Sequence, residues 1–405
     1  MSKKSPNILI LSLAGIGNFL IQSPVFRTLK QHYPHARLVV WVAPRGTKAL
    51  AQTNPYIDEV IEAPIRGSLL FHYQQLWRLR RGHYDIAIML HPGQLWKGAA
   101  YMYLAGIPKR LAHQYPYRHN PQSGFLLTDS VPPNPKLHDI EQNLNLLSKL
   151  EIALPAIARK QRLGNCLAGH SSQTTAGKLE IGSSYKINIP NKLTAQANKI
   201  LKSLNIPPGT TLVGLHPGSS QEFKWKRWPL ENFAKLAELL TNQTRYQQTI
   251  FLIFGGNDEN DIKQKLGELL KRQNTKYKIL NTTNLLTTAA IMKNCQLFIS
   301  NDSGLMHLAA IVGTPTLGLF GPTDENKTGP RGRQSWSVRA PETTPVYDVN
   351  TNYNFGSNTH PTLLKLAPEM VLPDIVSKAT SLRCASHSFS AGWRCVINRE
   401  TRQSN

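Results

Sequence analysis

Short apolar runs alternate with helix-like stretches along the first part of the chain. The runs at 8–13, 38–42 and 85–90 are almost wholly apolar, as expected of strands buried on both faces. The segments 47–52 and 69–81, by contrast, repeat their apolar residues at helical spacing. With a further strand expected at 59–62, this alternation predicts a parallel sheet covered by helices on both faces.

The first helix is expected to begin at Ser23-Pro24. Serine is a good N-cap, proline is favoured at the first helical position, and Phe26, Leu29 and Tyr33 follow at helical spacing.

A second α/β segment follows a break in the pattern. Residues from about 160 to 184 are rich in Gly, Ser and Thr, which indicates an irregular insertion or an interdomain connection. The alternation then resumes, with strands expected at 211–215, 250–254, 278–280, 297–300 and 316–320 and helices at 230–240, 261–271 and near 287–293. Two doubly wound domains in tandem are therefore predicted, with a ligand cleft between the carboxyl edges of their sheets.

These patterns divide the chain into four parts. Residues 1–190 form an N-terminal domain that includes the irregular insertion, and 191–340 form a C-terminal domain. Residues 341–382, with a helix expected at 368–379, are predicted to pack back on the N-terminal domain. Residues 383–405 form a basic tail that we expect to be poorly ordered.

The charge of the chain narrows the range of partners. Its 405 residues include 47 Lys and Arg against 24 Asp and Glu, a net charge of +23. Such a field favours anionic partners, namely sugar nucleotides, nucleic acid or an acidic membrane surface. Nucleic acid is not expected, because the sequence has no zinc-finger spacing, RNP-like motif or basic region leading into heptads. The cluster Arg78-Leu79-Arg80-Arg81 is either a solvated helix end or a contact for anionic lipid or an acidic acceptor.

The sequence predicts a cytoplasmic protein. It has no apolar run of the roughly 18 residues that span a bilayer. Lys3 and Lys4 before an apolar run resemble a signal peptide, but Gly15 and Gly17 soon interrupt that run, so we interpret it as a strand. The four cysteines lack close pairing or metal-ligand spacing and are expected to be reduced: Cys166, Cys295, Cys384 and Cys395.

The turn Asp302-Ser303-Gly304 carries the strongest chemical signal. It follows a predicted strand and precedes a helix-like stretch, so the first N–H groups of that helix would point at the carboxyl edge of the sheet. Such a helix N-terminus suits a phosphate or diphosphate. Ser303 can cap the helix, and Gly304 lets a ligand approach the backbone. An ordinary capped helix is the alternative.

Two more loops are expected at the same edge. Ser219 and Ser220 follow a strand and lead to Lys226, so hydroxyls, backbone donors and a cation can hold a diphosphate there. The alternative is a basic surface loop. Asp258 and Glu259 follow the next strand, where a carboxylate can bind ribose hydroxyls. Glu259 can equally be an acid of the first turn of a helix.

Together these motifs resemble those of glycosyltransferase family 9, the ADP-heptose:lipopolysaccharide heptosyltransferases and their relatives. The resemblance covers roughly residues 7–380 and includes Gly15-Ile16-Gly17-Asn18, Gly106-Ile107-Pro108-Lys109-Arg110, His216-Pro217-Gly218-Ser219, Lys226-Arg227-Trp228-Pro229, Gly255-Gly256-Asn257-Asp258-Glu259, Asn301-Asp302-Ser303-Gly304 with His307, and Phe320-Gly321-Pro322-Thr323. It implies a GT-B fold, in which two Rossmann-like domains face a central cleft. The donor would bind to the second domain and the acceptor to the first. It also implies inversion of the anomeric centre without a metal or other cofactor, and the sequence has no Asp-x-Asp motif.

The resemblance also assigns positions to the donor. Ser219, Ser220 and Lys226 would lie at the diphosphate, and Asp258 or Glu259 near the ribose. The phosphates and donor sugar would meet the group Asp302, Ser303, Gly304. His307 would either contact the donor or be a packed, hydrogen-bonded histidine.

Asn18 departs from the family pattern. Well-studied members have an aspartate here, taken as the base that deprotonates the acceptor hydroxyl. An amide can orient a hydroxyl but cannot accept its proton as a base must. Three explanations are open: another base such as His91, a transition state that needs little base assistance, or a protein that binds without turnover.

We therefore expect an inverting, metal-independent glycosyltransferase that moves a heptose-like sugar from a nucleoside diphosphate to a lipopolysaccharide or other cell-envelope glycan. It would work at the inner face of the membrane, with the basic first domain docked against anionic lipid or a phosphorylated acceptor. A catalytically silent sugar-nucleotide-binding protein of the same fold is the alternative. A dinucleotide-dependent oxidoreductase is disfavoured, because Leu20 stands where its glycine motif needs a third glycine.

Overall fold

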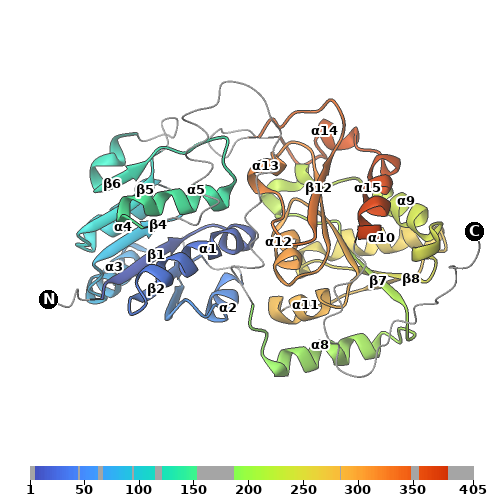
Figure 1. Ribbon diagram of the computed structural model, residues 1–405, viewed down its shortest axis with the longest axis horizontal. Helices are drawn as coiled ribbons and strands as arrows, with labels where there is room; N and C mark the ends of the chain where they lie inside the picture. The colour runs from blue at the N-terminus through green and yellow to red at the C-terminus, as the bar shows by residue number, and fades with distance from the viewer. Residues whose placement is uncertain are drawn as a thin grey trace, which may run out of the picture.

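Two α/β domains lie next to each other in the computed structural model, each built on one parallel sheet (Figure 1). The structure describes residues 5–43, 46–62, 67–93, 95–114, 121–152, 187–282, 284–347 and 355–381. The predicted insertion at 160–184, the tail at 383–405 and three of the four cysteines lie outside these ranges. Among the described residues, no helix combines the length and apolar character needed to cross a membrane.

The first domain is a three-layer arrangement. Within the described residues its sheet has six parallel strands in the order β3-β2-β1-β4-β5-β6. These are β1 (Asn7–Ser12), β2 (Arg37–Val42), β3 (Glu59–Glu62), β4 (Ile86–Met89), β5 (Lys109–His113) and β6 (Asp129–Val131). One face packs on α1 (Ile16–His32), α2 (Thr47–Gln52), α5 (Asp139–Leu146) and the 3-10 helix η2 (Leu147–Leu150). The other packs on α3 (Leu69–Arg81), α4 (Leu95–Leu104) and the 3-10 helix η1 (Pro121–Leu126).

Alternation along the strands explains the two faces. Ile8 and Ile10 belong to the core under α1, whereas Leu9 and Leu11 belong to the core under α3 and α4. Successive residues of a strand point to opposite sides of the sheet, so the apolar run at 8–13 supplies both cores. The predicted parallel sheet with helices on both faces is confirmed.

The predicted start of the first helix was wrong. α1 begins at Ile16, directly after β1, and Pro24 lies inside it. A proline in a helix interior costs about 3 kcal/mol. Here Phe19, Leu20 and Ile21, all buried, extend the helix by two turns before the proline, and their burial outweighs that cost. The Ser23 hydroxyl bonds the carbonyl of Leu20 (2.7 Å) within the helix instead of capping its start. The earlier start puts Asn18 in the first turn of α1.

The second domain repeats the arrangement. Its described part has six parallel strands in the order β12-β11-β10-β7-β8-β9. These are β7 (Thr211–His216), β8 (Thr249–Ile253), β9 (Tyr277–Ile279), β10 (Leu297–Asn301), β11 (Thr316–Phe320) and β12 (Ser335–Arg339). One face packs on α9 (Leu230–Thr241) and α10 (Asn260–Arg272), the other on α8 (Asn191–Ser203), α11 (Leu285–Met292) and α12 (Gly304–Ile311). Short elements complete it: η3 (Gln221–Lys226), η4 (Thr244–Tyr246), η5 (Asn257–Glu259) and α13 (Glu325–Thr328).

The segment after the second sheet does not pack on the first domain as predicted. Its helices α14 (Pro361–Leu364) and α15 (Pro368–Ser381) lie on the second domain, with α15 against α9. Val371 and Ile375 are buried in the core under α9. The indole Nε1 of Trp228 also donates to the carbonyl of Leu366 (2.8 Å), which ties this segment to the loop before α9. The apolar side of α15 therefore completes the second core.

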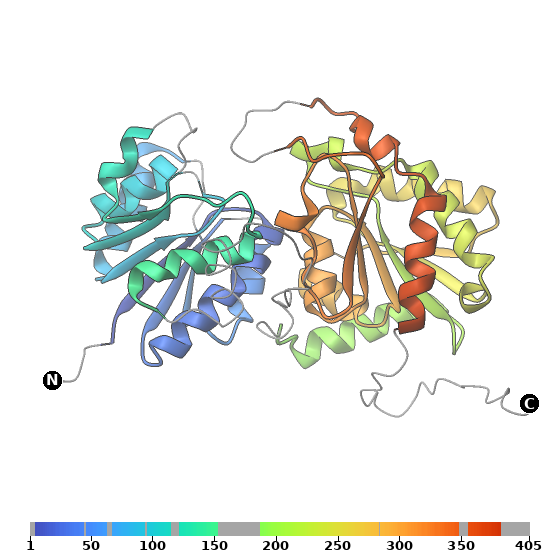
Figure 2. The same cartoon turned by 45° about the horizontal axis from the view of Figure 1, so that its top comes forward.

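The carboxyl edges of the two sheets face each other, with α1 against α12 (Figure 2). Gly17 and Gly304 make this close contact possible: a Cβ on Gly304 would lie 3.2 Å from the backbone nitrogen of Gly17. A second contact comes from the loop before α5, where His138 Nε2 lies 3.1 Å from the carbonyl oxygen of Gly329. The predicted positions of ligand-binding loops thus converge where the domains meet.

Candidate functional site

The turn between β10 and α12 is built as the sequence predicts. Ser303 is the N-cap of α12, and its hydroxyl accepts a hydrogen bond from the N–H of Met306 (3.4 Å). Asn301, buried at the end of β10, donates from its side chain to the carbonyls of Pro217 (2.8 Å) and Gly218 (3.3 Å). The β7 loop is therefore fixed beside the N-terminus of α12, which faces the first domain.

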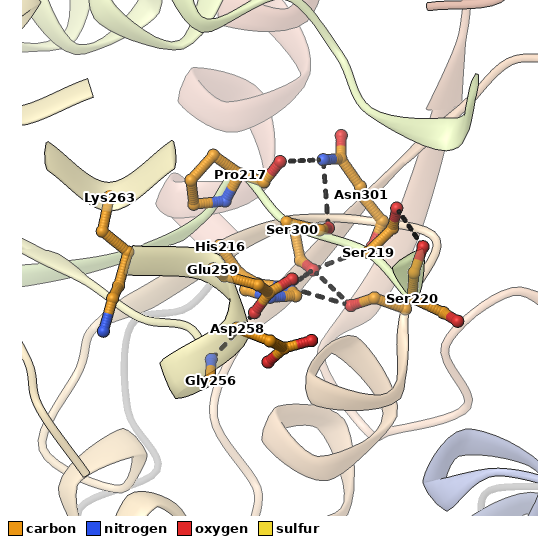
Figure 3. Close-up of polar contacts among 12 residues, drawn as sticks. His216, Pro217, Ser219, Ser220, Gly256, Asp258, Glu259, Lys263, Ser300 and Asn301 are labelled. Carbon is orange, nitrogen blue, oxygen red and sulfur yellow. Dashed lines mark hydrogen bonds and ion pairs between the residues drawn. The ribbon is translucent and has the colours of Figure 1, made fainter. Parts of the chain in front are cut away.

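A buried polar network connects three of the loops (Figure 3). His216, the last residue of β7, has Nδ1 3.0 Å from the Ser303 hydroxyl and Nε2 3.2 Å from a carboxylate oxygen of Glu259. The same carboxylate accepts the N–H of Gly256 (2.8 Å). Gly218 has to be glycine here, because a Cβ would lie 1.9 Å from Glu259 Oε1. The network fixes the relative positions of the β7, β8 and β10 loops.

Glu259 is held as a carboxylate inside this network. Burial alone would raise its pKa, but the charge of His216, the hydrogen bonds from His216 and Gly256, and the charge of Arg227 together lower the pKa below its usual value. Its neighbour Asp258 is exposed, and its backbone carbonyl accepts a hydrogen bond from the side chain of Gln221 (2.8 Å). Of the two carboxylates predicted near a ribose, one lies in the polar network and the other at the surface.

Lys226 lies next to the first turn of α12. Its Nζ is 2.7 Å from Asp302 Oδ2, and both side chains are largely buried. Rings of Phe223, Trp225 and Tyr347 surround the ammonium group at 5.1, 5.5 and 5.6 Å from their centroids. A positive charge is thus held beside the helix N-terminus, on the side of the second domain that faces the first.

Ser219 is buried and Ser220 is exposed. The Ser219 hydroxyl donates to the carbonyl of Phe223 (2.8 Å) and accepts from Arg227 Nε (3.1 Å). Arg227 also bonds the Ser219 carbonyl (2.8 Å). Ser219 thereby shapes the turn that leads to Lys226, whereas the hydroxyl of Ser220 is accessible to a ligand.

His307 lies one turn into α12, at the contact between the domains. A Cβ on Gly17 would come within 3.0 Å of its ring. The imidazole is buried, and its Nδ1 has no hydrogen-bond partner within the described part of the chain. Burial lowers its pKa to about 4, although the charges of Asp302 and Asp139 oppose this shift. A neutral imidazole with an unsatisfied nitrogen is suited to hydrogen-bond a ligand.

The first domain contributes a histidine and a carboxylate to the same region. Asp139 is the first residue of α5, and its Oδ1 lies 3.4 Å from Nε2 of His91, which follows β4. Both side chains are buried. The backbone of His91 is fixed by Asn143, whose Oδ1 accepts its N–H (2.7 Å). Asn18, half-buried, lies in the first turn of α1, the helix packed against α5.

The structure therefore brings together Lys226, Asp302, Ser303, Gly304 and His307, with Ser219 and Glu259 behind them. Sequence reasoning missed three supporting residues, His216, Arg227 and Asn301, although each lies within a motif it had singled out. It also missed Asp139. The capping pattern His138-Asp139-Ile140-Glu141 gives a local signal for a helix start, because the Glu141 side chain accepts the His138 N–H (2.9 Å).

The chain is similar to known proteins over most of its length. Residues 74–354 match the family described as glycosyltransferase family 9 (heptosyltransferase). The chain is 26% identical over 372 residues to lipooligosaccharide heptosyltransferase 2 of Haemophilus influenzae, covering 90% of this chain and 97% of that one. It is 25% identical over 381 residues to lipopolysaccharide heptosyltransferase 2 of Escherichia coli, covering 91% and 97%.

Solved structures share the fold. The structure of E. coli ADP-heptose LPS heptosyltransferase II superposes with a TM-score of 0.68 at 20% identity, covering 93% of this chain and 100% of that one.

Proposed function

The chain belongs to glycosyltransferase family 9, and on this premise we propose that it transfers a heptose from ADP-heptose to a lipopolysaccharide-type acceptor, with inversion and without a metal. The family resemblance of its sequence motifs is thereby confirmed, as are the enzyme class and the two-domain GT-B fold. The names of the relatives support the choice of a heptose and of a glycolipid acceptor. The name of the superposed E. coli structure supports ADP as the nucleotide.

The observation that carries the proposal is the position of Lys226 beside the N-terminus of α12. Transfer breaks the bond between C1 of the sugar and the diphosphate, and negative charge develops on the departing oxygen. We infer that this charge forms beside Lys226 Nζ, which is held 2.7 Å from Asp302, and beside the N-terminus of α12. In this proposal they supply the positive charge that a divalent ion supplies in metal-dependent transferases.

In this proposal the two domains bring the donor and the acceptor to opposite faces of C1. The donor lies on the second domain, with its diphosphate toward α12. The acceptor oxygen arrives from the first domain, on the opposite side of C1. A single displacement forms the acceptor O–C1 bond as the C1–diphosphate bond breaks, so the configuration at C1 inverts and ADP leaves.

A proton must also leave the acceptor hydroxyl, and Asn18 cannot take it. We assign this role to the carboxylate of Asp139, with His91 Nε2 at 3.4 Å to hold it in place. Asp139 lies at the carboxyl edge of the first sheet, and His138 beside it contacts Gly329 of the second domain (3.1 Å). Its charge acts on His307 of the second domain. This assignment corresponds to the first of the three explanations for Asn18, in which another residue acts as the base.

Two measurements test the function. A thermal-shift series with ADP-, GDP-, UDP- and dTDP-sugars should single out the ADP-sugar, since a ligand stabilises by RT ln(1 + [L]/Kd). Transfer from ADP-heptose to a heptose-deficient glycolipid should then give the α or β linkage opposite to that of the donor. No shift with any nucleotide would refute the donor site, and a shift without transfer would favour the silent binding protein.

A further inference from the structure

Helix α3 is apolar on its outward side as well as its buried side. Leu79 packs into the core, yet Leu70, Tyr73 and Trp77 are 66%, 66% and 48% exposed. Their spacing of three and four residues places them in one stripe along the helix. A surface helix normally carries polar residues on this side, so a stripe of this kind indicates an interaction surface.

Neighbouring elements extend the stripe. α4 packs beside α3, with the ring of His72 next to the Tyr101 ring (centroids 6.1 Å apart), and η1 packs against α4. On the outward side of this layer, Trp96, Tyr103 and Phe125 are 53%, 49% and 74% exposed. We call the surface formed by Leu70, Tyr73, Trp77, Trp96, Tyr103 and Phe125 the outer aromatic face.

Cations accompany the exposed rings. The guanidinium carbon of Arg81 lies 3.4 Å from the centroid of Trp77, and that of Arg110 lies 5.3 Å from the centroid of Tyr103. Lys97 Nζ lies 5.4 Å from the centroid of Trp96. Arg78 and Arg80 are exposed on the last turns of α3. Between Glu62 and Asp129 the sequence has a single acidic residue, Asp85.

This combination matches the chemistry of a bilayer surface. Tryptophan and tyrosine favour the headgroup region, where the ring meets lipid and the polar atom meets water. Arginine and lysine are attracted to anionic headgroups. A second copy of the chain does not fit, because two such faces would bring cations against cations. We propose that the outer aromatic face docks the first domain on a membrane that contains anionic phospholipid.

Docking in this way suits a lipid-linked acceptor, a step that rests on the proposed function. α3 and α4 follow parallel strands and so begin at the carboxyl edge of the sheet, which faces the second domain. One end of the outer aromatic face therefore lies toward the second domain. An acceptor can keep its lipid in the bilayer while its sugar reaches the site.

Vesicle sedimentation tests the proposal with the full-length protein. The wild type should bind vesicles of phosphatidylcholine mixed with phosphatidylglycerol, bind pure phosphatidylcholine much more weakly, and lose binding as salt is raised. The triple variant Arg78→Gln/Arg80→Gln/Arg81→Gln should weaken binding roughly a hundredfold, about fivefold for each cation removed. The double variant Trp77→Ser/Trp96→Ser should also weaken it.

Matched controls lie on the second domain. Lys265→Gln/Lys271→Gln/Arg272→Gln removes three exposed cations of α10, and Leu364→Ser/Met370→Ser removes two exposed apolar side chains. Both should bind vesicles like the wild type, and all four variants should keep the nucleotide-dependent thermal shift, which separates docking from donor binding. Wild-type affinity in the face variants, or equal binding to neutral vesicles, would overturn the proposal. So would a face variant that changes only self-association in light scattering.

Discussion

Lys226 Nζ lies 2.7 Å from Asp302 Oδ2, and together they place a cation beside the first turn of α12. The pair joins two loops from different strands of the second sheet. The rings of Phe223 and Trp225 also lie 5.1 and 5.5 Å from the ammonium group, so its position is set before any ligand arrives. Such preorganisation makes a charge effective at a leaving group.

Replacing Lys226 therefore tests its role directly. Lys226→Ala should lower kcat by about 10²–10³-fold, the usual effect of removing one group that stabilises developing charge. The loss should exceed any change in the KM for the donor, because the charge on the leaving oxygen is greatest in the transition state. Steady-state kinetics with ADP-heptose measures both, with the exposed Lys235→Ala as control. A raised KM for the donor with an unchanged kcat would assign Lys226 to ground-state binding.

Gly17 gives a test of the contact between the domains. A Cβ there would lie 3.0 Å from the His307 ring and 3.3 Å from Cα of Gly304. Gly17→Val should keep the domains apart, with a larger radius of gyration in X-ray scattering and a kcat reduced at least about tenfold, since 1 Å misplacements cost up to 10²-fold. The donor-induced thermal shift should persist. Gly15→Val is the matched control, because its Cβ would meet nothing within 4 Å. Similar effects of both variants would exclude this explanation.

The assignment of Asp139 predicts a specific loss. Asp139→Asn keeps the shape of the side chain but removes the proton acceptor, so kcat should fall about 10²–10⁴-fold. Donor binding, measured by thermal shift, should be unchanged.

A second substitution separates chemistry from structure in this prediction. Asn18→Asp in the Asp139→Asn background should restore part of the activity, because it supplies a carboxylate at the position the family uses. His91→Gln should shift the pH profile of kcat. An Asp139→Asn enzyme as fast as the wild type would remove Asp139 from the mechanism.

His307 predicts a dependence of stability on pH. Burial lowers its pKa from 6.5 to about 4, so the unfolded chain binds a proton more readily than the folded one. Its contribution is complete above pH 6.5 and is lost as the pH falls towards 4, on the order of 1.4 kcal/mol per pH unit. His113, also buried with a pKa of about 4, adds the same slope.

Urea unfolding between pH 4 and 7 measures this slope. His307→Gln should reduce it by about one proton relative to the wild type, whereas replacing the exposed His35 by Gln should not. An unchanged slope in His307→Gln would mean that the imidazole is not held neutral in the folded protein.

Local patterns predicted the central strands and the donor loops, but not every boundary. β7, β8, β10 and β11 are strongly apolar and buried on both faces, so their sequences are unambiguous. β5, with sequence Lys-Arg-Leu-Ala-His, and β12 were missed. Their mixed polar and apolar residues resemble a loop until a neighbouring strand pairs with them. The start of α1 was misplaced, since tertiary burial overrode a strong local signal at Ser23-Pro24.

In the candidate site, too, local sequence patterns predicted some residues and missed others. Ser219, Lys226, Asp302 and Ser303 lie in loops that follow strands of one sheet, and topology alone brings such loops to one edge. Asp139 belongs to the other domain, and its place beside His91 and near His307 depends on how the domains meet. The prediction that 341–382 packs on the first domain was wrong for a similar reason. The sequence of α15 does not show that α9 is the helix against which it packs.

The hydrogen bond between His138 and Gly329 has a consequence for hydrolysis of the bound donor by water. It keeps Asp139, the next residue along the chain, beside the second domain only while the two domains are in contact. When they separate, a bound donor meets water without a nearby proton acceptor, and water is then a poor competitor for the sugar. We therefore expect hydrolysis of the bound donor to be slow. Transfer should occur mainly when a glycolipid hydroxyl lies between the two domains.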